Sequence, residues 1–178
     1  MDENVKRAIE RWPDVPAAFG WLRLDRRGKW YLIDRNAPGF TEAEHGQGSL
    51  ISSEPIIEFI SRNYLHDDKG RWFWQNGPQK AYADLDLAPL ILRVVSGARG
   101  QALVTHTGYP VEHVEAAFVS ESGELFVQTD LGPGAIHGLD LSALELTEDH
   151  LTLDGRELAL QTLDGPPGPA LGFVTTPR

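Results

Sequence analysis

Cysteine is absent from this chain of 178 residues. Its absence excludes disulfide bonds, thiolate nucleophiles and Cys-ligated zinc or iron–sulfur sites. Long apolar runs are also missing, and no stretch reaches the roughly 18 apolar residues of a transmembrane helix. The first residues, MDENVKRAIERW, are acidic at the start and contain no apolar segment like that of a signal peptide. These features predict a cytoplasmic protein.

Positive charge is scarce relative to negative charge. Sixteen Lys and Arg residues stand against 26 Asp and Glu residues, which gives a formal net charge of −10. A field of this sign repels nucleic-acid backbones and anionic lipid surfaces. The composition therefore predicts no nucleic-acid partner and no membrane partner, and it leaves the oligomeric state open.

The strongest structural signals lie between Leu50 and Leu92. Ser52 or Ser53 is a candidate helix cap, and Pro55 fits the first helical turn, where a missing N–H has no cost. Apolar side chains then recur at helical spacing at Ile56, Ile57, Ile60 and Tyr64. The pattern predicts a helix over residues 53–65 that packs against a sheet.

An aromatic hairpin follows this helix. Alternation along Arg71-Trp72-Phe73-Trp74-Gln75 places Trp72 and Trp74 on one face of a strand. Asn76-Gly77 is a typical hairpin turn, and Pro78 begins the return strand. The two tryptophans either form the core under the helix or offer one indole to a flat ligand.

The rest of the chain predicts further hairpins and few helices. A short amphipathic helix is expected at residues 2–12. Hairpins are expected at 19–34, 116–130 and 151–160, strands at 90–95 and 102–106, a short helix at 140–146 and a closing strand at 171–175. The fold class is α+β, with two small similar halves that each contain antiparallel hairpins and one helix. The expected domains are residues 1–87 and 88–178.

The two halves show a similar layout. GWLRLDRRGKWYLID turns at Gly28, and AAFVSESGELFVQTD turns at Gly123. Each hairpin precedes a loop, a helical segment and an Asp- and Gly-containing turn that ends in Arg71 or Arg156. This order suggests duplication of a strand–strand–helix–strand unit.

These motifs resemble those of an uncharacterised family of bacterial proteins. The matching features are Gly28-Lys29-Trp30, the segment 51–64, Asp68-Lys69-Gly70, Trp72 to Trp74, Pro78, and Asp86 with Pro89. The resemblance implies a duplicated α+β core whose second half is loosely similar to a pleckstrin-homology fold. It also implies a nucleotide-like ligand between the halves.

A ligand site between two halves would involve the elements nearest their junction. The residues expected there are Trp74, Gln75, Asn76, Gln79, Lys80, His106 and Thr107. Indole and imidazole provide stacking faces, the amides and the hydroxyl orient the ligand, and Lys80 provides a positive charge. The alternative is that Trp74 belongs to the core and that the amides are turn residues.

Catalytic motifs are not evident. Ser52 and Ser53 lack the context of a nucleophile elbow. The glycine-rich segment 132–138 departs from the spacing of a dinucleotide-binding loop. The sequence therefore predicts a non-enzymatic small-ligand-binding or regulatory protein, active in signal transduction, with no catalytic residues, metal or cofactor. The alternatives are a small hydrolase-like enzyme that uses His106 or His137, and a protein-interaction module.

Overall fold

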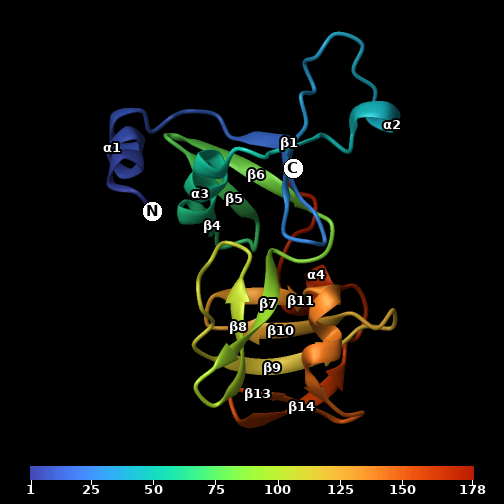
Figure 1. The fold of residues 1–178 in the computed structure, drawn as a ribbon. Helices are drawn as coiled ribbons and strands as arrows, with labels where there is room; N and C mark the ends of the chain where they lie inside the picture. Colours follow the sequence, from blue (N-terminus) through green and yellow to red (C-terminus); the bar gives the residue numbers. More distant parts are fainter. The chain divides into compact units, whose positions relative to one another are not determined.

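A computed structural model describes residues 1–178, which form two compact units. The first unit consists of Met1–Asp25, Lys29–Asp86 and Val174–Arg178. The second consists of Arg26–Gly28 and Leu87–Phe173. Strands predominate over helices in the chain (Figure 1). This confirms the α+β class.

A six-stranded sheet forms the framework of the first unit. Its elements are α1 (Glu3–Arg11), β1 (Ala18–Leu24), β2 (Trp30–Leu32), α2 (Glu42–His45), β3 (Ser49–Leu50), α3 (Glu54–Arg62), β4 (Tyr64–His66), β5 (Trp72–Asn76) and β6 (Gln79–Leu85). The strand order is β3-β2-β1-β6-β5-β4. Neighbours are antiparallel except for the central pair, where β1 runs parallel to β6.

The predicted central helix is confirmed in its core, but its predicted end is wrong. Ile60 is completely buried, as expected, whereas Ile56 is 45% exposed. The helix ends at Arg62 because the buried Asn63 side chain donates to the Phe59 carbonyl at 2.9 Å. Tyr64, which fits the helical stripe, instead begins β4 opposite Trp74.

The aromatic hairpin is confirmed, with its turn displaced by one residue. Asn76 pairs with Gln79, so Gly77-Pro78 forms the two-residue turn. Gly77 has a φ of +57°, the left-handed conformation that this kind of turn needs at its first position. Trp72, Phe73 and Gln75 are all buried, so both faces of β5 are covered.

An eight-stranded sheet forms the second unit. Its elements are β7 (Leu90–Gly97), β8 (Gly100–Thr105), β9 (Val114–Val119), β10 (Leu125–Thr129), β11 (Gly132–Ile136), the 3-10 helix η1 (Gly138–Ala143), β12 (Glu145–Leu146), β13 (His150–Leu153), β14 (Arg156–Thr162) and α4 (Pro167–Leu171). The strand order is β12-β13-β14-β9-β10-β11-β7-β8. The pairs β7–β11 and β9–β14 are parallel.

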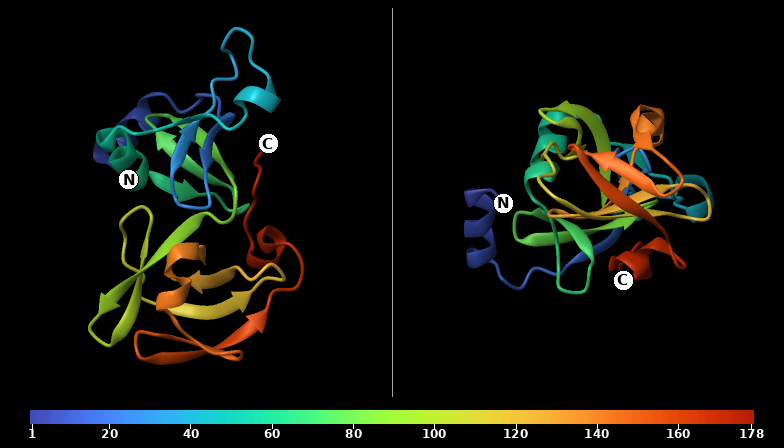
Figure 2. Two further views of the ribbon diagram at one scale, coloured as in Figure 1. Left: turned by 45° about the vertical axis from the view of Figure 1, so that its right-hand side comes forward. Right: turned by 90° about the horizontal axis from the view of Figure 1, so that it is seen from below.

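The sheet of the second unit curls until β13 lies against β8 (Figure 2). The N–H of Asp154 donates to the carbonyl of Gln101 at 2.6 Å. The side-chain oxygen of Gln101 accepts the N–H of Glu145 at 3.0 Å. These contacts between β8 and the β12–β13 end of the sheet form a seam. An eight-stranded curled sheet encloses space for side chains or one small ligand.

The glycine-rich segment 132–138 contains β11, in which Ala135 and Ile136 are buried. Two predictions for the second unit are wrong. The short helix predicted at 140–146 is η1 followed by β12. The predicted closing strand at 171–175 is also wrong. Pro167 starts α4 and Gly172, at a φ of +78°, ends it, an arrangement typical of helix termini.

Four hairpin turns share one hydrogen-bond pattern. In each turn, the first residue donates its N–H to the carbonyl four residues later, and its side-chain oxygen accepts the N–H of that residue. The first residues are Asp25, Asp67, Thr105 and Ser120. A glycine with positive φ precedes the last residue, as in three-residue turns with a bulge. Two of these turns belong to the predicted hairpins at 19–34 and 116–130, which are confirmed.

We predict that Ile60→Ala destabilises the protein by about 2–5 kcal/mol, because it leaves a cavity under α3. The matched control is Ile56→Ala on the exposed side, which should change stability by less than about 0.5 kcal/mol. Denaturant unfolding of both variants provides the measurement. Equal losses for the two variants would contradict this assignment of the helix faces.

Candidate functional site

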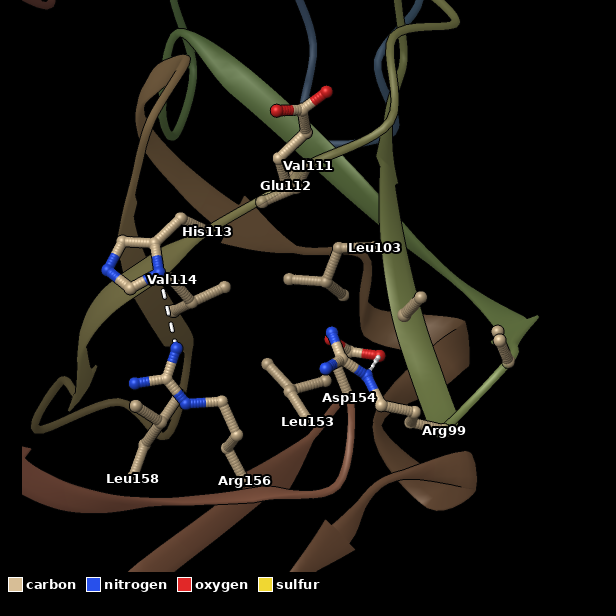
Figure 3. Close-up of a pocket in the computed structure, with 13 residues that line it drawn as sticks. Arg99, Leu103, Val111, Glu112, His113, Val114, Leu153, Asp154, Arg156 and Leu158 are labelled. Atoms are coloured by element: carbon tan, nitrogen blue, oxygen red, sulfur yellow. Dashed lines mark hydrogen bonds and ion pairs between the residues drawn. The ribbon is translucent and has the colours of Figure 1, made fainter.

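A cavity of about 340 Å³ lies within the second unit, at the seam of the curled sheet. It is lined by the β7–β8 turn, β8, the segment 111–114 and the β13–β14 hairpin (Figure 3). This volume falls in the range of about 300–1,000 Å³ that is usual for small-molecule sites. The charged and ionisable lining residues are Arg99, Glu112, His113, Asp154 and Arg156.

Leucine and valine side chains form the apolar part of the cavity. Leu103 from β8 and Leu153 from β13 are both buried, and Val114 and Leu158 complete this wall. Strand alternation explains the arrangement, because every second residue of a strand faces the same side. Arg156 therefore shares a face with Leu158 and lies opposite Leu153 in the strand register.

Arg156 has an unusual partner. Its Nη1 lies 3.3 Å from Nδ1 of His113, and no carboxylate forms an ion pair with it. A guanidinium can only donate, so Nδ1 of His113 is the acceptor in this contact. The N–H groups of Glu112 and His113 both donate to Oδ1 of Asp130, at 3.2 and 3.0 Å, which fixes the backbone that carries the imidazole.

Arg99, the second guanidinium at the cavity, is paired differently. Its Nε lies 3.2 Å from Oδ1 of Asp154, and its Nη2 contacts the other carboxylate oxygen. The side chain of Arg99 is 73% exposed, so this ion pair contributes little to stability. Asp154 has a φ of +50° in the turn with Gly155, a conformation that aspartate tolerates better than most residues. The turn thus places Arg99 and Asp154, whose charges neutralise each other, at the cavity.

Two strongly perturbed carboxylates lie elsewhere. Burial alone would raise the pKa of Asp67, but hydrogen bonds from Arg71, the Tyr82 hydroxyl and the Lys69 backbone lower it to about 2. The hydroxyls of Ser120 and Ser122, together with Arg26, lower the pKa of Glu124 to about 2. Neither carboxylate lines the cavity. Both hold hairpin turns together.

Five of the predicted ligand-binding residues lie on the β5–β6 hairpin of the first unit. Gln75 is buried and donates to the Gly77 carbonyl at 2.9 Å, and Gln79 donates to the Pro16 carbonyl at 3.0 Å. Trp74 packs edge-on against Phe59, with ring centroids 5.8 Å apart. The ammonium of Lys80 lies 4.7 Å from the centre of the Phe73 ring, and Asn76 is exposed.

The predicted histidine and threonine positions lie in the second unit. Nδ1 of His106 accepts the N–H of Ile91 at 3.2 Å, and the hydroxyl of Thr107 lies 2.8 Å from that of Thr105. Nδ1 of His137 accepts the N–H of Leu139 at 3.2 Å and so caps η1. None of the predicted ligand-binding residues lines the cavity. Their role in binding stays a prediction.

The sequence interpretation missed the charged residues of the cavity, although one of them carries a local signal. In Leu151-Thr-Leu-Asp-Gly-Arg-Glu-Leu-Ala-Leu, the hairpin about Asp154-Gly155 places Arg156 in the inward row with Leu158 and Leu160. A cation in a strand row that is otherwise apolar indicates a candidate binding residue. His113 has no comparable signal, because it approaches Arg156 only in the folded sheet.

No group of three or more His, Asp or Glu side chains is arranged to hold a metal ion. None of the helices has both the length and the apolar character required to span a bilayer.

The fold and the cavity define an α+β protein of two sheets with a small-molecule-sized site in the second unit. A family model, DUF2944, described as "Protein of unknown function (DUF2946)", matches residues 1–165. The chain therefore belongs to this family of unknown function. It matches no functionally curated protein.

Two crystal structures align with this chain. A DUF1285 family protein from Silicibacter pomeroyi DSS-3 aligns over 85% of both chains, with 17% sequence identity and a TM-score of 0.53. A DUF1285 family protein from Shewanella baltica OS155 aligns over 69% of this chain and 88% of its own, with 11% identity and a TM-score of 0.48. At this identity the first likeness concerns the fold alone.

We predict that Asp67→Asn lowers stability at neutral pH by roughly 2 kcal/mol, the free energy that corresponds to its lowered pKa. Because the folded-state pKa is below that of the unfolded chain, this contribution is present above about pH 4 and disappears as the pH falls toward 2. Denaturant unfolding at neutral pH and near pH 2 should show a loss for the variant only at neutral pH. Asp68→Asn, at an exposed position of the same turn, is the control and should match the wild type.

Proposed function

We propose that this protein is a non-enzymatic small-ligand-binding protein and that its ligand occupies the cavity of the second unit. The observation that best supports this proposal is the cavity of about 340 Å³, with its apolar wall and a few charged side chains. Sites for small molecules commonly combine apolar walls with a small number of oriented polar groups. A regulatory role in signal transduction would follow if occupancy of the cavity alters a partner's affinity.

The composition of the cavity favours binding over catalysis. No serine or threonine lies among its lining residues, and its one histidine directs Nδ1 at a guanidinium. A nucleophile and a base within hydrogen-bond reach are the basis of covalent hydrolysis. The other two candidate bases, His106 and His137, each accept a backbone N–H through Nδ1. These contacts support structural roles and weigh against the hydrolase-like alternative.

We also propose that the chain contains a duplicated core. The order β3-β2-β1-β6-β5-β4 in the first unit corresponds strand for strand to β11-β10-β9-β14-β13-β12 in the second. In both units the central pair is parallel, β1 with β6 and β9 with β14, and a helical segment joins the two sets of three strands. The β7–β8 hairpin is additional. The likeness of the second half to a pleckstrin-homology fold and the cytoplasmic location remain proposals.

A nucleotide-like ligand remains a candidate, and the seven residues predicted from the sequence remain the alternative site. A thermal-shift panel of nucleotides and organic metabolites tests both sites. A ligand at 100 times its Kd should stabilise the protein by about 2.7 kcal/mol. The expected rise in melting temperature is then roughly 5–10 °C for a chain of this size.

We predict that Val114→Phe, which places an aromatic ring in the cavity, abolishes the stabilisation by any ligand found in this panel. Gln79→Ala and His106→Ala should keep the ligand-induced shift, because neither side chain lines the cavity. The melting temperature of each ligand-free variant is measured in parallel to detect loss of folding. If Val114→Phe still binds the ligand and Gln79→Ala and His106→Ala do not, the site lies at the residues predicted from the sequence. Conversion of the ligand during incubation would favour an enzyme.

A further inference from the structure

The electrostatic pairing of the arginines indicates the chemical class of the ligand. Most arginine side chains of the chain form ion pairs with carboxylates. Arg99 at the cavity does so as well, through Asp154. Arg156 instead donates to an imidazole nitrogen, Nδ1 of His113. Of the two arginines that line the cavity, it is therefore the one without a carboxylate partner.

The position of Arg156 reinforces this contrast. It occupies the inward row of β14, opposite Leu153, where an apolar side chain would continue the pattern. Glu112 also lines the cavity, but its carboxylate points away from the guanidinium in Figure 3. Arg156 donates through Nη1 to Nδ1 of His113. The other N–H groups of the fork are therefore available to a ligand.

His113 orients this guanidinium. The segment 111–114 is held by Asp130, whose carboxylate accepts two successive backbone N–H groups. The backbone that carries His113 is thereby fixed, and the imidazole beside Arg156 reduces the number of positions that the guanidinium can adopt. A pre-oriented guanidinium binds a carboxylate or phosphate through two parallel hydrogen bonds at a lower entropic cost than a mobile one.

We propose that Arg156 is the anion-recognition residue of this cavity and that the ligand is a small organic anion. The carboxylate or phosphate group pairs with Arg156, and the apolar body lies along Leu103, Val114 and Leu153. Arg99 has no such role, because Asp154 neutralises it. This inference rests on the proposed ligand-binding function and specifies the chemistry of the same site.

Isothermal titration calorimetry of the full chain with three matched probes tests the inference. Phenylacetate and phenyl phosphate carry an anionic group on one aromatic ring, and phenylacetamide is the neutral counterpart of the first. Charge-assisted hydrogen bonds contribute enough that the better anion should bind roughly tenfold to hundredfold more tightly than the amide. A preference between the two anions identifies the recognised group as carboxylate or phosphate.

Two arginine variants provide the matched comparison. Arg156→Gln should weaken binding of the better anion by at least about tenfold and leave binding of phenylacetamide unchanged. Arg99→Gln, at the same cavity, should change the affinity for the anion by less than about threefold. The ligand-free melting temperatures of both variants should match the wild type, because both side chains are exposed.

Two results would overturn the inference. Equal affinities for the anions and the amide would show an apolar cavity without anion recognition, and the proposed binding function would still stand. Equal losses in Arg156→Gln and Arg99→Gln would show a general charge effect rather than recognition by Arg156. The variant Val114→Phe, which obstructs the cavity, separates these cases from failure of the proposed function. If all probes still bind to this variant, the cavity is not the binding site.

Discussion

The seam between β8 and β13 is the constraint on which the second unit depends. The short hydrogen bond from Asp154 to Gln101, and that from Glu145 to the side chain of Gln101, bring together the two ends of one long sheet. Without this contact, Leu103 and Leu153 would face solvent, and burial of apolar surface contributes about 25 cal/mol per Å². The same turn carries Arg156 to the cavity wall and holds Arg99 in a neutral pair. The same contact therefore closes the sheet and encloses the cavity.

Charged groups in the chain fall into two kinds. Asp67 and Glu124 accept several hydrogen bonds, have pKa values lowered to about 2, and hold turns in place. Their hydrogen-bonding capacity is used by the fold. Arg156 differs, because it lies beside apolar side chains and donates to an imidazole nitrogen rather than to a carboxylate. This unneutralised charge is the basis of the anion site that we propose for the cavity.

Local signals predicted many elements but not all of their ends. The hairpins about Gly28, Gly123 and Asp154-Gly155 follow from turn chemistry that needs only neighbouring residues. The end of α3 could not be read in this way. Tyr64 continues the helical stripe in sequence, but Asn63 is held by Phe59 and by the N–H of Asp2, 61 residues away. Similarly, an apolar segment after Pro167 fits a strand locally and forms a helix terminus in the structure.

The sequence by itself determined the α+β class, the hairpin positions and the absence of thiol chemistry, because these depend on composition and short-range geometry. Only the tertiary structure decided where the cavity of the second unit forms. His113 and Arg156 are 43 residues apart, and Arg99 and Asp154 are 55 apart, so their pairing depends on the register of strands across the curled sheet. Register across a sheet is set by the packing of the whole inward face, which no local stretch of residues specifies.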